Sequence, residues 1–432
     1  MQAKKTEAAP ASSRYTAGHL SSYCLILRTN THYRRYWLSG CVSQIGDWFN
    51  YIAIFVLLNQ LTGSGKAVSW FLIAKHLAPA VFGPAAGVIA DRYNRKVVMI
   101  SCDLLRAVLV LGYLLVQNTQ QVWLIYLLAF TQEAIWTFYN PARQASLPNL
   151  CNKEELGIAN GLSGASWSVM LALGAALGGF FTHRLGWQAA IVADSVSFFL
   201  SALVMASVAL PRWEKKPGQG FFIGRITGYD DLKEGVFYVL SQPKIAVLLL
   251  VKSGWSLAGG ILVMLAVFGE QVFAGGGEGG RSGILFAMRG LGAAIGPILA
   301  WRLMGEGSTA MRRAIGWAFF LSALAYVFFS QAPTMLWAAL WVCCGHAGGS
   351  VQWVFSTTLI HRSVEDRFRG RVFSAEMAML TLVLSLSIWL TGAAMDAGTD
   401  PRHIVFVLAL LYLLPGIGWT LYTTTHESGS SA

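Results

Sequence analysis

Residues Gly83 to Lys96 read GPAAGVIADRYNRK and join two long apolar segments through one short charged turn. Gly83, Gly87 and Asp91 recur at every fourth position, so they share one face of a helix that another backbone can approach closely. The turn that follows is basic, with Arg92, Arg95 and Lys96. A basic turn between two apolar spans indicates the cytoplasmic side of a membrane.

The composition is that of a membrane protein. Of the 432 residues, 55% are hydrophobic and only 12% are charged, whereas a soluble domain carries roughly a quarter of its residues as charges. The formal net charge of +11 comes from bases in the short loops between apolar segments, so it indicates topology and gives no reason to expect a nucleic-acid partner. The six cysteines lack the spacing of metal ligands, and neither a metal nor a cofactor is expected.

The hydrophobic pattern predicts twelve membrane spans, since each crossing needs about 20 apolar residues. We expect these spans at 36–61, 67–90, 97–117, 121–147, 157–182, 187–210, 245–272, 281–303, 312–330, 334–360, 371–395 and 402–423. The predicted organisation is a cytoplasmic tail (1–33), a six-helix bundle (34–210), a linker (211–243), a second six-helix bundle (244–424) and a C-terminal tail (425–432). Within the linker, Leu232, Val236, Val239 and Leu240 predict a short amphipathic helix on the membrane surface.

The distribution of Lys and Arg among the loops orients these spans. When the loops are assigned to alternate sides, only Lys66, Arg184, Arg281 and Arg402 fall on the side opposite the termini. This asymmetry predicts an even number of spans with both termini in the cytoplasm, in the inner or plasma membrane.

Two further motifs and a faint internal repeat accompany the opening stretch. PARQA occupies 141–145, RGRV occupies 369–372, and Gly292, Gly296 and Ala300 repeat the spacing of Gly83, Gly87 and Asp91 without the acid. Together these features resemble the major facilitator superfamily of transporters, in the branch of the enterobactin exporter and the macrolide efflux proteins. The resemblance implies an all-α membrane protein of twelve transmembrane helices in two pseudo-symmetric bundles.

Ionisable residues at membrane depth are functional candidates because burying them is costly. The resemblance implies that helices 1, 4, 7 and 10 line a central cavity, and each carries one such residue: Asp47, Glu133, Lys252 and His346. Asp47, Glu133 and His346 are candidates for proton coupling, because a buried carboxylate can take up a proton near physiological pH. The alternative is a static pair in which Lys75 or His76 neutralises Asp47. Asp103 and Arg106, three residues apart, predict a structural pair within one helix.

The charged turn is interpreted through the resemblance. It implies that Asp91 holds the two bundles together on the cytoplasmic side in the outward-open state, with Arg143 in the same network and Glu376 paired with the Arg92 turn. The alternative is a topology anchor and loop staple without a gating role. The gating candidates are therefore Gly83, Gly87, Asp91, Arg92, Arg95, Lys96, Arg143 and Glu376.

Aromatic and basic residues near the intramembrane acids suggest the cargo. A wide amphipathic cavity for a bulky aromatic molecule is expected from Trp48, Trp136, Trp255 and Trp353. Positive charge at Lys75, Lys252 and Arg289, with His76 nearby, favours an acidic or catecholate-like cargo.

The sequence thus predicts a secondary-active exporter, expected to be monomeric, that exchanges protons for a siderophore or an amphipathic drug-like molecule. No nucleotide-binding motif is present, so the energy source is a gradient. A lysophospholipid or lipid translocator remains open as an alternative. From other classes, so do a membrane-embedded enzyme, which the scattered acids disfavour, and a non-transporting sensor on the same fold.

Overall fold

The computed structural model describes residues 20–210, 237, 239, 241–273, 279–305 and 307–427, and within these ranges it is helical without a β-strand. The first half contains α1 (Leu20–Thr29), α2 (Thr31–Thr62), α3 (Gly65–Arg92), α4 (Arg95–Leu111), η1 (Gly112–Leu115), η2 (Thr119–Gln121), α5 (Val122–Ser146), η3 (Leu147–Asn149) and α6 (Lys153–Ala206). The second half contains α9 (Pro243–Ser256), α10 (Ile261–Val267), η4 (Phe268–Val272), α11 (Gly280–Met304), α12 (Ser308–Ser330), α13 (Met335–Ser363), α14 (Asp366–Asp396), α15 (Pro401–Leu411) and α16 (Leu413–Glu427). The amphipathic helix predicted for the linker lies outside the described residues, apart from Phe237 and Val239.

The described helices form twelve long stretches. One long helix contains two of these stretches, and two other stretches are each built from more than one helical segment. The long α6 bends at Gly186, whose φ of 85° is accessible to glycine, and so forms two spans. The α9, α10 and η4 segments together form one span, and α15 with α16 forms another. Twelve helical stretches among the described residues therefore correspond to the twelve predicted spans, with ends that differ by a few residues, and eight of the described helices are long and apolar enough to cross a membrane.

Polar side chains set many of the helix ends. Asn30, Ser64 and Asn94 accept hydrogen bonds from backbone N–H groups at the starts of α2, α3 and α4. Asn152 and Glu155 form a reciprocal capping box at the start of α6. These caps occur in the short connections, so they fix where each apolar span begins.

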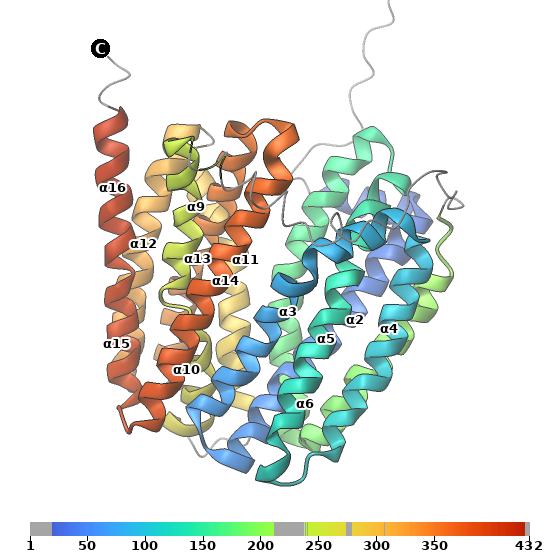
Figure 1. The fold of residues 1–432 in the computed structure, drawn as a ribbon, viewed down its shortest axis with the longest axis horizontal. Helices are drawn as coiled ribbons and strands as arrows, with labels where there is room; N and C mark the ends of the chain where they lie inside the picture. Colours follow the sequence, from blue (N-terminus) through green and yellow to red (C-terminus); the bar gives the residue numbers. More distant parts are fainter. Residues whose placement is uncertain are drawn as a thin grey trace, which may run out of the picture.

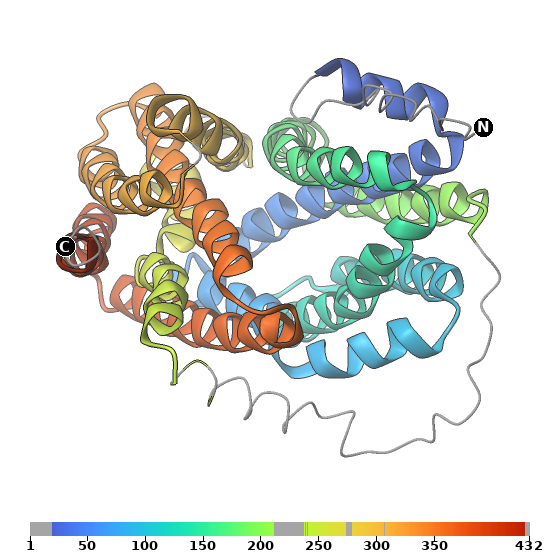
Figure 2. The same ribbon diagram turned by 90° about the horizontal axis from the view of Figure 1, so that it is seen from above.

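The helices form two bundles that follow the halves of the chain (Figure 1). Seen from above, α2 to α6 lie on one side and α9 to α16 on the other (Figure 2). Across the boundary, α3 packs against α14 and α6 packs against α11. This is the predicted all-α architecture of two six-helix bundles.

The bundles are joined at the face opposite the chain termini, through contacts that we call the outer seam. Ser64 Oγ donates to Asp396 at 2.9 Å, and Gln271 Nε2 donates to Asn59 Oδ1 at 2.9 Å. Backbones also meet closely between α6 and α11, since a Cβ added to Gly283 would lie 2.6 Å from the carbonyl oxygen of Ala175. The outer seam therefore depends on both hydrogen bonds and small residues.

Candidate functional site

An ion pair between α3 and α5 lies in the first bundle. Lys75 Nζ is 2.9 Å from Glu133 Oε2, and the two side chains are 19% and 20% exposed. The ring of Tyr51 lies 5.9 Å from the same ammonium group. Glu133 therefore has a basic partner within reach of solvent, which corrects the alternative that pairs Lys75 with Asp47.

A second charged group is centred on Arg106 of α4, which is 1% exposed. Its Nη2 donates to Asp103 Oδ1 at 2.6 Å, and Ser201 Oγ donates to the other oxygen of Asp103 at 2.7 Å. The predicted Asp103–Arg106 pair is confirmed. Arg106 also stacks against Phe198, with 4.1 Å between the guanidinium carbon and the ring centre, so the base is held rigidly.

Asp47 is the more loosely held acid of this group. Its Oδ2 is 3.7 Å from Arg106 Nη1, and its side chain is 33% exposed. Gln132 Nε2 donates to Oδ1 at the long distance of 3.5 Å, and Tyr113 orients Gln132. The base beside Asp47 is therefore Arg106, and His76 instead lies 2.7 Å from the Leu72 carbonyl of its own helix.

Asp194, on the second span of α6, is a buried acid that the sequence reasoning missed. Its side chain is 0% exposed, and neither carboxylate oxygen has a hydrogen-bond partner. It packs against α2 at Gly46, where an added Cβ would lie 2.7 Å from Asp194 Oδ1. The rule that singled out Asp47 and Glu133, an ionisable residue within an apolar span, applies equally to Asp194.

The second bundle holds its own ion pair, between α9 and α14. Lys252 Nζ donates to Glu376 Oε2 at 2.6 Å, and both side chains are almost fully buried. The Trp353 ring lies 4.7 Å from the same ammonium group. The partner of Glu376 among the described residues is therefore Lys252, which engages one carboxylate oxygen and leaves Oε1 buried without a hydrogen bond. The expected pairing with the Arg92 turn stays a prediction, because the Arg92 side chain lies outside the described residues.

His346 and Arg289 are the remaining intramembrane candidates with a basic side chain, and neither forms an ion pair among the described residues. His346 Nδ1 lies 2.6 Å from the hydroxyl of Tyr326 on α12, and the histidine is buried within the second bundle. Arg289 on α11 has no acidic partner among the described residues, its Nε is buried without an acceptor, and its guanidinium lies 6.0 Å from the Phe286 ring. Of the three bases predicted to attract an acidic cargo, only Arg289 is left without an acid in the part of the chain that the structure describes.

The aromatic candidates divide between the two bundles. Trp48 packs against Tyr51 and, across the bundle boundary, against Phe286, with ring centres 5.0 and 5.9 Å apart. Trp255 and Trp353 meet edge to face at 5.9 Å in the second bundle. Trp136 is half-buried on α5. The structure therefore brings Trp48 and Arg289 to the same boundary, whereas Trp255 and Trp353 lie by the Lys252 pair.

Three of the basic gating candidates have contacts in the structure, two of them in the charged turn and one at the end of α5. Arg95 donates to the carbonyl oxygen of Ala145 at 2.6 Å, and Lys96 donates to that of Ala206 at 2.6 Å. Arg143 lies over the Tyr36 ring at 4.1 Å. The contacts of Arg95 and Lys96 tie the turn to the ends of other helices of the first bundle, as a loop staple would, whereas Arg143 joins α5 to α2. The surroundings of Gly87 and the side chains of Asp91 and Arg92 are outside what the structure describes.

The two glycine rows of the internal repeat have different neighbours. A Cβ added to Gly83 would meet nothing within 4 Å, whereas one added to Gly292 or Gly296 would collide with the backbone of α13. The row in the second bundle is thus a packing surface, and the row in the first bundle faces open space at Gly83.

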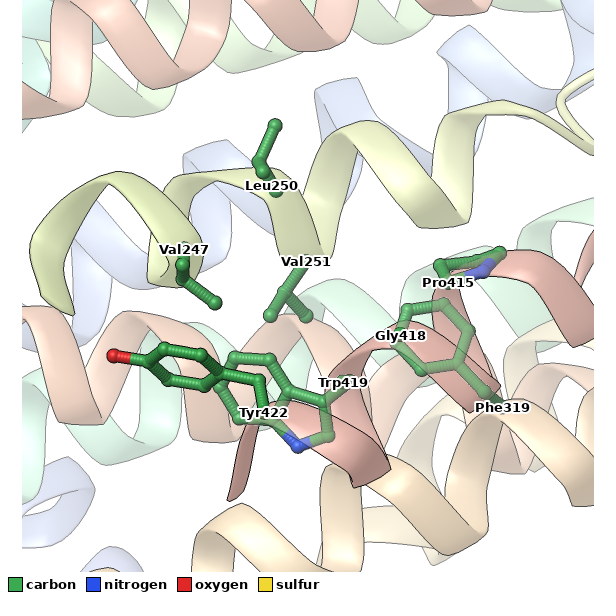
Figure 3. Close-up of a pocket in the computed structure, with 8 residues that line it drawn as sticks. All are labelled: Val247, Leu250, Val251, Phe319, Pro415, Gly418, Trp419 and Tyr422. Atoms are coloured by element: carbon green, nitrogen blue, oxygen red, sulfur yellow. The ribbon is translucent and has the colours of Figure 1, made fainter. Parts of the chain in front are cut away.

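A small apolar cavity of about 260 Å³ lies elsewhere, between α9, α12 and α16 (Figure 3). Val247, Val251, Phe319, Pro415 and Trp419 are among its lining residues. It contains none of the candidate residues. The described ranges contain no group of three or more His, Cys, Asp or Glu side chains that could hold a metal ion.

A family model described as Major Facilitator Superfamily matches residues 36–387. The chain belongs to this superfamily. The predicted resemblance is therefore confirmed, and the two bundles are those of a transporter.

Relatives of this transporter include efflux proteins. Macrolide efflux protein A from Streptococcus pyogenes is 24% identical over 372 residues, which are 83% of this chain and 88% of that protein. The putative bacilysin exporter BacE from Bacillus subtilis is 22% identical over 362 residues, 83% of this chain and 87% of that one. The match to the uncharacterized MFS-type transporter YkuC of Bacillus subtilis is 27% identical and spans about half of each chain, 51% and 52%.

Solved structures agree on the fold. A bacterial homologue of the human lysosomal transporter Spinster, in an inward-facing and unoccupied conformation, superimposes with a TM-score of 0.72. It is 14% identical, and the match covers 92% of this chain and 98% of that one. At this identity the likeness concerns the fold alone.

Proposed function

We propose that this superfamily transporter exports a small molecule from the cytoplasm by alternating access, in exchange for protons. The observation that carries the proposal is the position of the outer seam relative to the acids. The Ser64–Asp396 contact joins the bundles at the face opposite the termini, and the partly exposed acids Asp47 and Glu133 lie in the middle of their helices. Alternating access between an inward-open and an outward-open state requires an interface that opens on one face of the membrane when it closes on the other.

The orientation follows from the positive-inside rule. With the basic loops and both termini in the cytoplasm of a plasma or inner membrane, the outer seam closes the external side. The conformation is then inward-facing. The open space beside Gly83 fits this state, because a bare glycine face on α3 is available for α14 to approach when the cytoplasmic side closes.

Proton coupling is assigned to Glu133 and Asp47. Glu133 shares its charge with Lys75, and Asp47 shares Arg106 with Asp103. Protonation of either acid releases a base in the middle of the bundle, and that changes the charge presented to cargo or to the neighbouring helix. His346 has a weaker claim, because Tyr326 already engages its ring and it is buried away from the first bundle.

For the cargo we propose an amphipathic, drug-like or siderophore-like molecule with an acidic group. Aromatic surface at Trp48 and Phe286 lies beside Arg289, which has no acid partner in the described ranges. An aromatic surface with a free guanidinium favours an aromatic anion. The names of two relatives, a macrolide efflux protein and a putative bacilysin exporter, support export of such small molecules.

The test is uptake into inverted membrane vesicles under a pH gradient, with a panel of catecholate siderophores, macrolides, short peptides and lysophospholipids. We expect uptake of the catecholate siderophores, which are the acidic aromatic members of the panel, and its loss when a protonophore collapses the gradient. Uptake of lysophospholipid alone would replace the proposal with lipid translocation. Uptake that persists after collapse of the gradient would contradict proton exchange.

A further inference from the structure

We propose that Asp194 is a second proton-binding site of this transporter, which holds a proton in the conformation described here and exchanges it with Asp47. Its role in transport depends on the proposed proton-coupled export. Its protonation does not, because that follows from the surroundings of the side chain alone.

The first argument is burial without a partner. Asp194 is fully buried, neither of its oxygens makes a close hydrogen bond, and the polar group beside it is the neutral amide of Asn50. An ionised carboxylate in such a place loses its hydration without any replacement, whereas a neutral carboxylic acid does not carry this cost. The protonated form is therefore the stable one.

The second argument is the contrast with the other acids of the same bundle. Asp103 receives hydrogen bonds from Arg106 and Ser201, and Glu133 has Lys75. Asp47 has Arg106 at 3.7 Å. Among the described acids of these membrane spans, Asp194 is the one without a donor.

The third argument is the charge of the whole group. Asp194 experiences Asp47 from α2, Lys75 from α3 and Arg106 from α4. Arg106 is already engaged by Asp103, and Lys75 by Glu133. Four acids thus share two bases, and a proton on Asp194 removes one of the unmatched negative charges without any movement of a helix.

We assign Asp47 as the exchange partner for this proton, because its charge acts on Asp194. Asp47 follows Gly46, and it is Gly46 that packs against Asp194. Asp47 is 33% exposed, so it can exchange protons with water. Asn50, one turn further along α2, is the polar side chain next to Asp194, and its Nδ2 is buried without a partner. In the transfer, the O–H bond of the Asp47 carboxylic acid breaks and an O–H bond forms on the Asp194 carboxylate, and the reverse step returns the proton.

The decisive experiment is infrared difference spectroscopy on the purified, full-length transporter as the pH is changed. We expect a carbonyl band of a protonated, buried carboxylic acid at neutral pH in the wild type, and loss of that band in Asp194→Asn. The matched control is Asp103→Asn, which removes an equally buried but paired aspartate and should leave the band in place. If Asp194→Asn does not fold, Asp194→Ser takes its place, and the carbonyl band should be lost in that variant as well.

Two results would overturn the proposal. One is a band that remains in both Asp194 variants. The other is a band that disappears when sodium replaces choline at constant pH, because Asp194 would then bind a metal cation in place of a proton. In proteoliposomes that transport, Asp194→Asn should lower the ratio of protons to cargo. Absence of any pH-driven transport in the wild type would count against the proposed export and leave the infrared result intact.

Discussion

Lys75 on α3 pairs with Glu133 on α5 at 2.9 Å, while the acid one helix away, Asp47, is left to share Arg106 with Asp103. The lysine therefore forms its ion pair with the acid of the fourth span, while its charge also acts on Asp47. Glu133 and Asp47, the two candidates for proton coupling, have different basic partners in their ion pairs. Their roles can therefore be tested separately by mutation.

Glu133→Gln should lower substrate-driven proton movement, because an amide cannot carry the proton and leaves Lys75 charged without a partner. A static pair predicts something different: the double variant Glu133→Gln with Lys75→Gln would then recover the wild-type proton movement. We expect the double variant to keep the loss. Proton flux reported by a trapped pH indicator distinguishes the two, and Asp400→Asn, in an exposed helix cap, serves as the control.

The buried Lys252–Glu376 pair should matter for stability. Glu376→Gln leaves a buried ammonium group without its carboxylate, which costs about 3–5 kcal/mol when a buried pair is broken. Replacement of both residues, by Met at 252 and Leu at 376, should recover most of this loss. Thermal unfolding in detergent checks both values. A single variant as stable as the wild type would show that this pair does not hold α9 to α14.

The outer seam should open when its small residues are enlarged. Gly283→Leu places a side chain where the Ala175 carbonyl oxygen now lies, so α6 and α11 cannot stay in contact. Spin labels at the exposed positions Lys66 and Thr399, in a background without native cysteines, should then report a longer distance. Gly83→Leu, which meets open space, should leave the distance unchanged.

Arg289 should determine the preference for anionic cargo. Arg289→Gln removes a charged hydrogen-bond donor worth about 1.5–3 kcal/mol, so binding of an anionic cargo should weaken by at least about tenfold. A neutral analogue should bind almost as before. Arg184→Gln is the control, because this base lies over the Phe180 ring of its own helix, 5.5 Å away. Equal loss for both cargoes would assign Arg289 a packing role.

The spans and the two-bundle fold were predictable because apolar length and the basic loops determine them directly. The Asp103–Arg106 pair was predictable for the same kind of reason, since both residues share one helix. The partners of Asp47, Glu133 and Glu376 were not, because each depends on which faces of separate helices meet. Asp194 was overlooked although its position in an apolar span marks it as clearly as that of Asp47.

The most direct test of the account is the release of protons driven by cargo in proteoliposomes containing the purified transporter. Addition of a transported cargo should move protons in the opposite direction in the wild type, and fewer protons per cargo in Glu133→Gln. Cargo movement without any proton movement in the wild type, or unchanged proton movement in Glu133→Gln, would contradict the proposed mechanism.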